Sequence, residues 1–204
     1  MTTLPSRFGV DGSLVAEHGN AFHGFHQRHA PLSDDDVARA ARADEIRAEI
    51  EVLATVPGTS FLDRSPVIGV INPLAVPMRV TGAVDEHGVP TVTGDVTFGV
   101  AYEGPPGCVH GGIIAAYFDE VLGVAQSMTG NPGMTVNLSV DYVAPTPLGR
   151  PVTFRGTVTS VEGRKIRTSG SLHHGDVLCA TATGLFVSMR PEVFERLLRM
   201  REQQ

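Results

Sequence analysis

The apolar residues of the chain are densest between Ile113 and Met128. They lie all the way round a helical wheel rather than along one stripe, which is typical of a helix that other structure encloses. The run has only 16 residues and is interrupted by Asp119, Glu120 and Gln126, so it is too short and too polar to cross a bilayer. We therefore predict one buried central helix.

Alternating apolar and polar residues predict strands on both sides of this helix. Two candidates precede it and four follow it: residues 78–85, 91–102, 134–143, 151–161, 165–173 and 177–189. Turn sequences at 86–88, 162–164 and 174–176 join neighbouring candidates as antiparallel hairpins, and the last three strands form a meander. One long helix with about six antiparallel strands predicts an α+β fold whose sheet wraps round the helix.

Two segments flank this domain, which we place at residues 61–190. Residues 1–60 are expected to form an arm and then an amphipathic helix, which starts at the cap Ser33 before three aspartates and ends near Val56. Residues 191–204 begin with a proline and are predicted to form a short C-terminal helix.

The linker between arm and strands carries apolar residues that either line a channel for an apolar ligand or pack as another strand. They are Phe61, Leu62, Val67, Ile68, Val70 and Ile71. The arm carries His18, His23, His26 and His29. Because it lacks the cysteines, carboxylates and spacing that ligand sites need, we expect no metal there.

Composition and charge narrow the class of protein. With 42% hydrophobic residues, 19% charged residues and a net charge of -6, the chain is typical of a globular protein and has no basic surplus for nucleic acid. Its two cysteines lie far apart and no secretory signal precedes them, which favours a reduced, cytoplasmic protein. We expect neither nucleic acid nor a membrane as a partner.

Chemistry is expected at the start and in the middle of the central helix. Gly111 and Gly112 stand where a ligand can approach the backbone closely and where helix N–H groups have no internal partner. The positive end of the helix dipole suits an oxygen that gains negative charge. Asp119 lies within the apolar run, where burial of an unpaired carboxylate is costly, so we expect it to serve a function. Glu120 is expected to point elsewhere on the wheel and not to substitute.

The motif His110-Gly111-Gly112, with Asp119 nine residues after the histidine, resembles the hotdog-fold acyl-CoA thioesterases of the phenylacetate-pathway and THEM type. The strand at 134–143, with its Thr-Val-Asn-Leu segment and Tyr-x-x-Pro end, strengthens the resemblance, which covers residues 78–189. It implies a hotdog fold, an enzyme that hydrolyses an acyl-CoA thioester to the free acid and coenzyme A, and active sites at a homodimer interface. No cofactor is implied, because coenzyme A is part of the substrate.

The resemblance also implies roles for individual residues. Asp119 is the general base or the nucleophile, and the N–H groups of Gly111, which comes first, and of Gly112 form the oxyanion hole. Thr135 matches a residue that orients water or the carboxylate, although a β-branched residue suits any strand. His110 either fixes the loop or assists the carbonyl oxygen.

The implied substrate contacts are Asn137, Arg164, Lys165 and Arg167. The three basic residues either meet the phosphates of coenzyme A or only cover a solvated hairpin. Members of the family often carry an asparagine or similar residue about six positions before the motif histidine. Here that position is Gly104, so the hydrogen-bond support of the loop is an open question.

Helix geometry predicts a dimer independently of the resemblance. Asp119 lies eight residues beyond Gly111, hence about 12 Å along the axis at ~1.5 Å per residue. One acyl carbon cannot contact both residues of one helix. Two antiparallel helices must therefore contribute, which a two-fold homodimer provides. Pairing of such dimers into a homotetramer stays open.

Two other functions fit the fold. A hotdog module that binds acyl-CoA without hydrolysis has no need of a buried carboxylate, so Asp119 favours the enzyme. A hotdog hydratase acting on enoyl-CoA is less favoured, because His110 precedes the helix instead of pairing with an aspartate in a hydratase motif.

Overall fold

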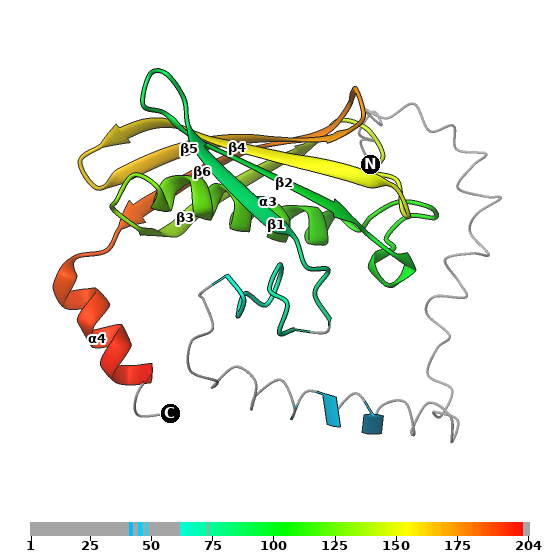
Figure 1. Ribbon diagram of the computed structural model, residues 1–204, viewed down its shortest axis with the longest axis horizontal. Coiled ribbons are helices and arrows are strands. Elements are labelled where there is room, and N and C mark those ends of the chain that lie inside the picture. The colour runs from blue at the N-terminus through cyan, green and yellow to red at the C-terminus, as the bar shows by residue number, and fades with distance from the viewer. Residues whose placement is uncertain (1–40, 43–44, 47, 49–61, 73, 202–204) are drawn as a thin grey trace, which may run out of the picture. The chain divides into compact units, whose positions relative to one another are not determined.

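The computed structural model describes residues 41–42, 45–46, 48, 62–72 and 74–201 (Figure 1). The chain divides into two units, residues 1–49 and 50–204. The five described residues of the first unit are helical, in agreement with the amphipathic helix predicted there. The remainder of that helix, the four arm histidines and Phe61 lie outside the described residues.

Six antiparallel strands of the described chain form one sheet, in the order β1-β2-β4-β5-β6-β3 (Figure 1). They are β1 Arg79–Val84, β2 Pro90–Thr97, β3 Gly133–Tyr142, β4 Pro151–Glu162, β5 Lys165–His174 and β6 Val177–Ser188. All six predicted strands are confirmed. The predicted end of β2 at residue 102 was wrong: its partner β4 begins at Pro151, opposite Thr97, and the unpaired chain beyond forms the 3-10 helix η1 (Val100–Tyr102).

The predicted meander is formed by β4, β5 and β6. The hairpin between β4 and β5 turns through Gly163 at φ +59°, and the hairpin between β5 and β6 turns through Gly175 at φ +55°. A side chain at either position would be strained, because this region of φ disfavours residues with a Cβ. Glycine at these two positions therefore fixes the register of three strands.

The central helix α3 (Gly111–Ser127) packs along one face of the sheet (Figure 1). Phe118, Val121 and Leu122 are completely buried in this contact. Gly156 and Gly170, which pair across β4 and β5, face the helix, and a Cβ on Gly156 would lie 2.9 Å from Val121 Cγ1. These glycines let the helix approach the sheet closely, as expected for an enclosed apolar run.

Residues 62–72 and 74–77, which we call the strap, run beside α3 without forming a strand. Of the two alternatives left open for the apolar residues of this linker, packing as another strand is therefore excluded for the described residues. Ile68 is buried at 3% exposure, whereas Val70 is 67% exposed. Burial raises the pKa of Tyr117 on α3 to about 12, so its phenol stays protonated and donates to the carbonyl of Val76 at 2.6 Å.

The chain continues after β6 into α4 (Pro191–Arg201), the short final helix that the sequence predicts. Pro191 occupies its first position, and Arg190 O accepts hydrogen bonds from the N–H groups of Val193 and Phe194. Among the described residues, no helix has the length and apolar content that spanning a membrane requires.

Candidate active site

The central helix starts directly after His110, which caps it with both its backbone and its ring. The carbonyl accepts from Ile113 N at 3.0 Å and Ile114 N at 3.2 Å, and Nδ1 accepts from Gly112 N at 3.0 Å. An accepting Nδ1 puts the ring proton on Nε2. The N–H of Gly112 is therefore already used, and the expectation that both glycines offer donors does not hold for this residue.

Gly111 is the glycine that keeps a free donor. Its N–H has no acceptor within the described part of the chain, and it lies at the positive end of a 17-residue helix. Its carbonyl accepts from Tyr142 Oη at 2.7 Å, and a Cβ on Gly111 would lie 3.2 Å from the tyrosine ring. Tyr142 on β3 thus holds the residue that carries this donor, through the peptide group that follows it.

The loop before His110 is held by contacts that replace the missing asparagine. Glu103 Oε1 accepts from Gly107 N at 2.7 Å, and Gly104 N donates to Cys108 O at 2.9 Å. A Cβ on Gly104 would lie 2.8 Å from the Cα of His110, so a side chain does not fit there. The loop is supported by a carboxylate and by backbone bonds instead of an amide.

Asp119 and Thr135 are brought together, as expected of an oriented carboxylate. Thr135 Oγ1 donates to Asp119 Oδ1 at 2.8 Å. A register shift in the pairing of β3 with β6, between Thr135 and Asn137, makes this contact possible. On a regular strand, residues two positions apart, such as Thr135 and Asn137, would point to the same face. The irregularity separates them, so that Thr135 faces α3 and Asn137 does not.

Asp119 lines a cavity of about 530 Å³. Its apolar walls come from the strap, α3, β6, the residue after β6 and α4, through Leu62, Val124, Phe186, Met189 and Phe194. Cavities of this size with apolar walls and few polar groups are typical of small-molecule sites. The polar residues of the lining are Asp119, Glu120, Gln126, Ser127 and Thr135, and of these Asp119 with Thr135 is the pair on which the predicted reaction depends.

Glu120 lines the same cavity as Asp119, although the two carboxylates point to different elements, Asp119 to β3 and Glu120 to the strap. Its Oε1 accepts from Ser65 Oγ on the strap at 2.8 Å. Burial raises the pKa of Glu120, while the hydrogen bond from Ser65 opposes that shift and the charge of Asp119 adds to it. Two carboxylates therefore border the cavity, each held by a different hydroxyl.

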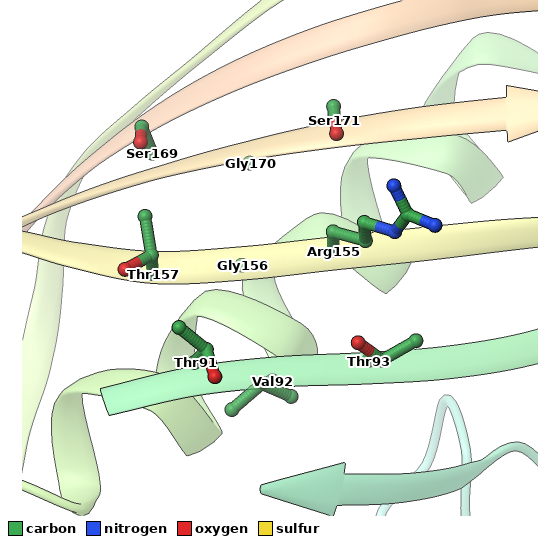
Figure 2. A pocket seen from close by; sticks show the side chains of 9 residues that line it. All are labelled: Thr91, Val92, Thr93, Arg155, Gly156, Thr157, Ser169, Gly170 and Ser171. Atoms are coloured by element: carbon green, nitrogen blue, oxygen red, sulfur yellow. The ribbon is translucent and has the colours of Figure 1, made fainter. Parts of the chain in front are cut away.

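The outer face of the sheet carries different hollows. One of about 320 Å³ is lined by residues of β2, β4 and β5, among them Arg155, Thr157, Ser169 and Ser171 (Figure 2). A neighbouring hollow of about 300 Å³ contains two predicted substrate contacts, Asn137 and Arg167. The other two predicted contacts are also exposed: Arg164 lies on the β4–β5 turn, where its Nε donates to Ser188 O at 2.9 Å, and Lys165 is the first residue of β5. None of the four lines the Asp119 cavity.

Three residues of the site escaped the sequence analysis: Glu103, Tyr142 and Ser65. Each acts through a partner distant in sequence or through a loop whose shape is set by the fold, so no local spacing marks it. Tyr142 carried one usable signal, because its position at the Tyr-x-x-Pro strand end belongs to the resemblance. In the ranges that the structure describes, no group of three His, Cys, Asp or Glu side chains is arranged to hold a metal ion.

Comparison with known proteins decides the family. Residues 106–183 match the thioesterase superfamily. A crystal structure of a thioesterase superfamily protein, 33% identical, covers 88% of this chain and 96% of its own with a TM-score of 0.60. The chain belongs to the thioesterase superfamily. The match to this structure extends beyond residues 78–189, so the shared region is longer than the motifs indicate.

Similarity to further proteins supports the predicted hotdog fold and family. A phenylacetic acid degradation-related protein from Ralstonia eutropha JMP134 is 25% identical, with a TM-score of 0.50, over 68% of this chain and 98% of that protein. Acyl-coenzyme A thioesterase THEM4 of Xenopus laevis is 42% identical over 91 residues, and that of Bos taurus is 38% identical over 92. The chain covers only 41% and 38% of these two curated relatives.

Proposed function

We propose that the protein hydrolyses acyl-CoA thioesters to a free acid and coenzyme A. The proposal rests mainly on the position of Asp119, whose carboxylate accepts a hydrogen bond from Thr135 and lines a largely apolar cavity. Both curated relatives are named acyl-coenzyme A thioesterases, which supports the same substrate class here.

The chemistry assigns one task to the start of α3 and another to its middle. Water, deprotonated by Asp119, attacks the thioester carbon, or Asp119 attacks it directly and water then opens the anhydride. In both routes the carbonyl oxygen becomes an oxyanion, which the free N–H of Gly111 stabilises. The C–S bond then breaks, and the coenzyme A sulfur leaves and takes up a proton. His110 serves by fixing the turn that presents Gly111, and no cofactor is needed.

The complete site is proposed to lie between two copies of the chain. Gly111 and Asp119 stand at the first and ninth positions of the same helix, about 12 Å apart along its axis at ~1.5 Å per residue. The edge strand β3 supports pairing of copies, because it exposes apolar residues such as Met134 at 56% and Val136 at 61%. A two-fold pair would bring Gly111 of one copy toward Asp119 of the other.

Substrate binding is proposed to use the cavity for the acyl group and basic residues for coenzyme A. Arg164 on the β4–β5 turn and Lys165 at the start of β5 are exposed, and Arg167 with Asn137 borders a hollow on the outer face. These side chains would meet phosphates or polar groups of the nucleotide part.

Release of free thiol from short, aromatic and long acyl-CoAs tests the function. We expect turnover by the wild-type protein, and a loss of about 10²–10⁴-fold in kcat for Asp119→Asn and Asp119→Ala. Arg155→Ala is the control, because Arg155 lies on the outer face and should leave kcat unchanged.

Absence of turnover on every acyl-CoA would exclude the enzyme. Binding without turnover would then leave the acyl-CoA-binding module as the function. Undiminished turnover in both Asp119 variants would exclude Asp119 as base or nucleophile.

A further inference from the structure

The second carboxylate of the cavity, Glu120, has no task in the proposed hydrolysis. Its side chain accepts a hydrogen bond from Ser65 Oγ, and Ser65 lies 55 positions earlier in the chain and is only 3% exposed. The bond therefore joins the strap to the central helix next to Asp119. Partial burial of this carboxyl group raises the pKa of Glu120.

Ser65 uses its complete hydrogen-bonding capacity at this point. Its hydroxyl donates to Glu120 and accepts from Val67 N and Ile68 N, both at 3.1 Å. A serine hydroxyl has one proton and two lone pairs, so none is left over. Loss of this hydroxyl would leave two backbone N–H groups and one carboxylate without their partner.

This contact lies close to the wall of the cavity. Leu62, three residues before Ser65, contributes an apolar side chain to the wall that also contains Asp119 and Glu120. The strap is fixed a second time by Tyr117 Oη, which donates to Val76 O, and Ile68 anchors it in the core. Of these three anchors, the Ser65–Glu120 bond is the nearest to Leu62 in sequence, and Ser65 N donates to Leu62 O at 3.1 Å.

We propose that the Ser65–Glu120 hydrogen bond sets the acyl selectivity of the cavity by holding Leu62 in its wall. The proposal rests on the proposed hydrolysis of acyl-CoA and adds a specificity determinant to it. Glu120 is here a positioning residue and Leu62 the residue that meets the acyl chain. Acyl groups long enough to reach Leu62 gain from the contact, whereas short ones do not.

Steady-state kinetics over a series of straight-chain acyl-CoAs tests this, with Ser65→Ala, Glu120→Ala and Leu62→Ala. For long chains we expect each variant to raise KM by about fourfold or more, the factor that one buried methylene provides. For acetyl-CoA, KM should stay at the wild-type value. kcat should change less than about twofold throughout, since Asp119 and Thr135 are untouched.

Glu120→Gln is the matched rescue variant, because an amide oxygen still accepts from Ser65. It should keep the wild-type chain-length profile. Hydrogen exchange separates the two parts of the proposal: the amides of Val67 and Ile68 should exchange faster in Ser65→Ala and at the wild-type rate in Leu62→Ala. Ser171→Ala on the outer face controls for loss of a hydroxyl as such. If Ser65→Ala does not fold, the pair Glu120→Ala and Glu120→Gln decides.

Calorimetric binding of non-hydrolysable thioether analogues of the same acyl-CoAs distinguishes failure of this inference from failure of the proposed function. A chain-length dependence that weakens in Glu120→Ala, without turnover in the wild type, would support the inference and exclude the hydrolase. Parallel profiles in wild type, Glu120→Ala and Leu62→Ala would overturn the inference while leaving hydrolysis in place. No binding of any analogue by the wild type would overturn both.

Discussion

The two faces of the one sheet differ in what their hollows contain. The face toward α3 borders a cavity of about 530 Å³ with apolar walls and two carboxylates, whereas the outer face carries a hollow of about 320 Å³ lined by hydroxyls, glycines and Arg155 (Figure 2). Both surfaces are concave, but of these two only the cavity next to α3 combines carboxylates with apolar walls. Such surroundings strengthen electrostatic interactions and shift pKa values, as at Glu120. Concavity alone therefore does not mark the reactive site.

The same strands build both faces. On β5, Gly170 faces the helix while Ser169 and Ser171 line the outer hollow. On β3, the register shift moves Thr135 to the inner face and Asn137 to the outer one. The comparison shows that period-two alternation distributes residues between faces, and that one irregularity reassigns them.

The largest expected effect in this comparison is the fall in kcat on loss of the free N–H at the start of α3. Gly111→Pro removes the free N–H but suits the first helical position, and His110 before it already has the extended conformation, φ -61° and ψ 132°, that a residue before proline prefers. Loss of an oxyanion donor should lower kcat by about 10²–10³-fold. Gly111→Ala keeps the N–H and adds only a Cβ beside Tyr142, so it should lose far less in the same thiol-release assay.

Mixing the variants tests whether two chains share one site. Gly111→Pro and Asp119→Asn should each be inactive alone. Co-refolded in equal amounts, they should recover about a quarter of wild-type activity, because half the dimers are mixed and each has one intact site. No recovery, despite mixed dimers seen by native mass spectrometry, would contradict a shared site.

A smaller effect is expected from Gly170→Ala, which tests the close packing of the inner face. The added Cβ would lie 2.7 Å from the backbone oxygen of Arg155, so the strand itself must shift. Overpacking of this kind should lower the free energy of unfolding by about 1–3 kcal/mol, measured by denaturant titration. Ser171→Ala, next along β5 but on the outer face, should stay within about 0.5 kcal/mol of the wild type. Equal losses in both variants would remove the distinction between the faces.

The smallest effect is expected on the outer face, from Arg167→Ala. An exposed arginine that meets a phosphate contributes about 0.2–1 kcal/mol, hence a rise of up to about fivefold in KM with kcat unchanged. The rise should shrink at high salt, and it should vanish with an acyl-pantetheine substrate, which lacks the nucleotide phosphates. A KM rise that persists with acyl-pantetheine would show that Arg167 acts on the fold and not on a phosphate.

Prediction from sequence succeeded where one local pattern suffices. The apolar run of α3 and the period-two strands of the meander are local, and glycine turns such as Gly163 mark their ends, so element type and order followed from the chain. The end of β2 could not be predicted from its own sequence, because it depends on where the neighbouring strand β4 begins. The conformation of the linker could not be predicted either, since its apolar residues fit a strand as well as the turns that Ser65 stabilises.

The sequence by itself determined the central helix, the alternation of the strands and the pairing of a glycine-started helix with a lone aspartate, because each depends on residues a few positions apart. Only the tertiary structure decided which groups are free to react. The ring of His110 takes up the N–H of Gly112 and leaves that of Gly111 free, and Ser65 comes to Glu120 across 55 positions. Such contacts depend on how the chain closes upon itself, which no local pattern encodes.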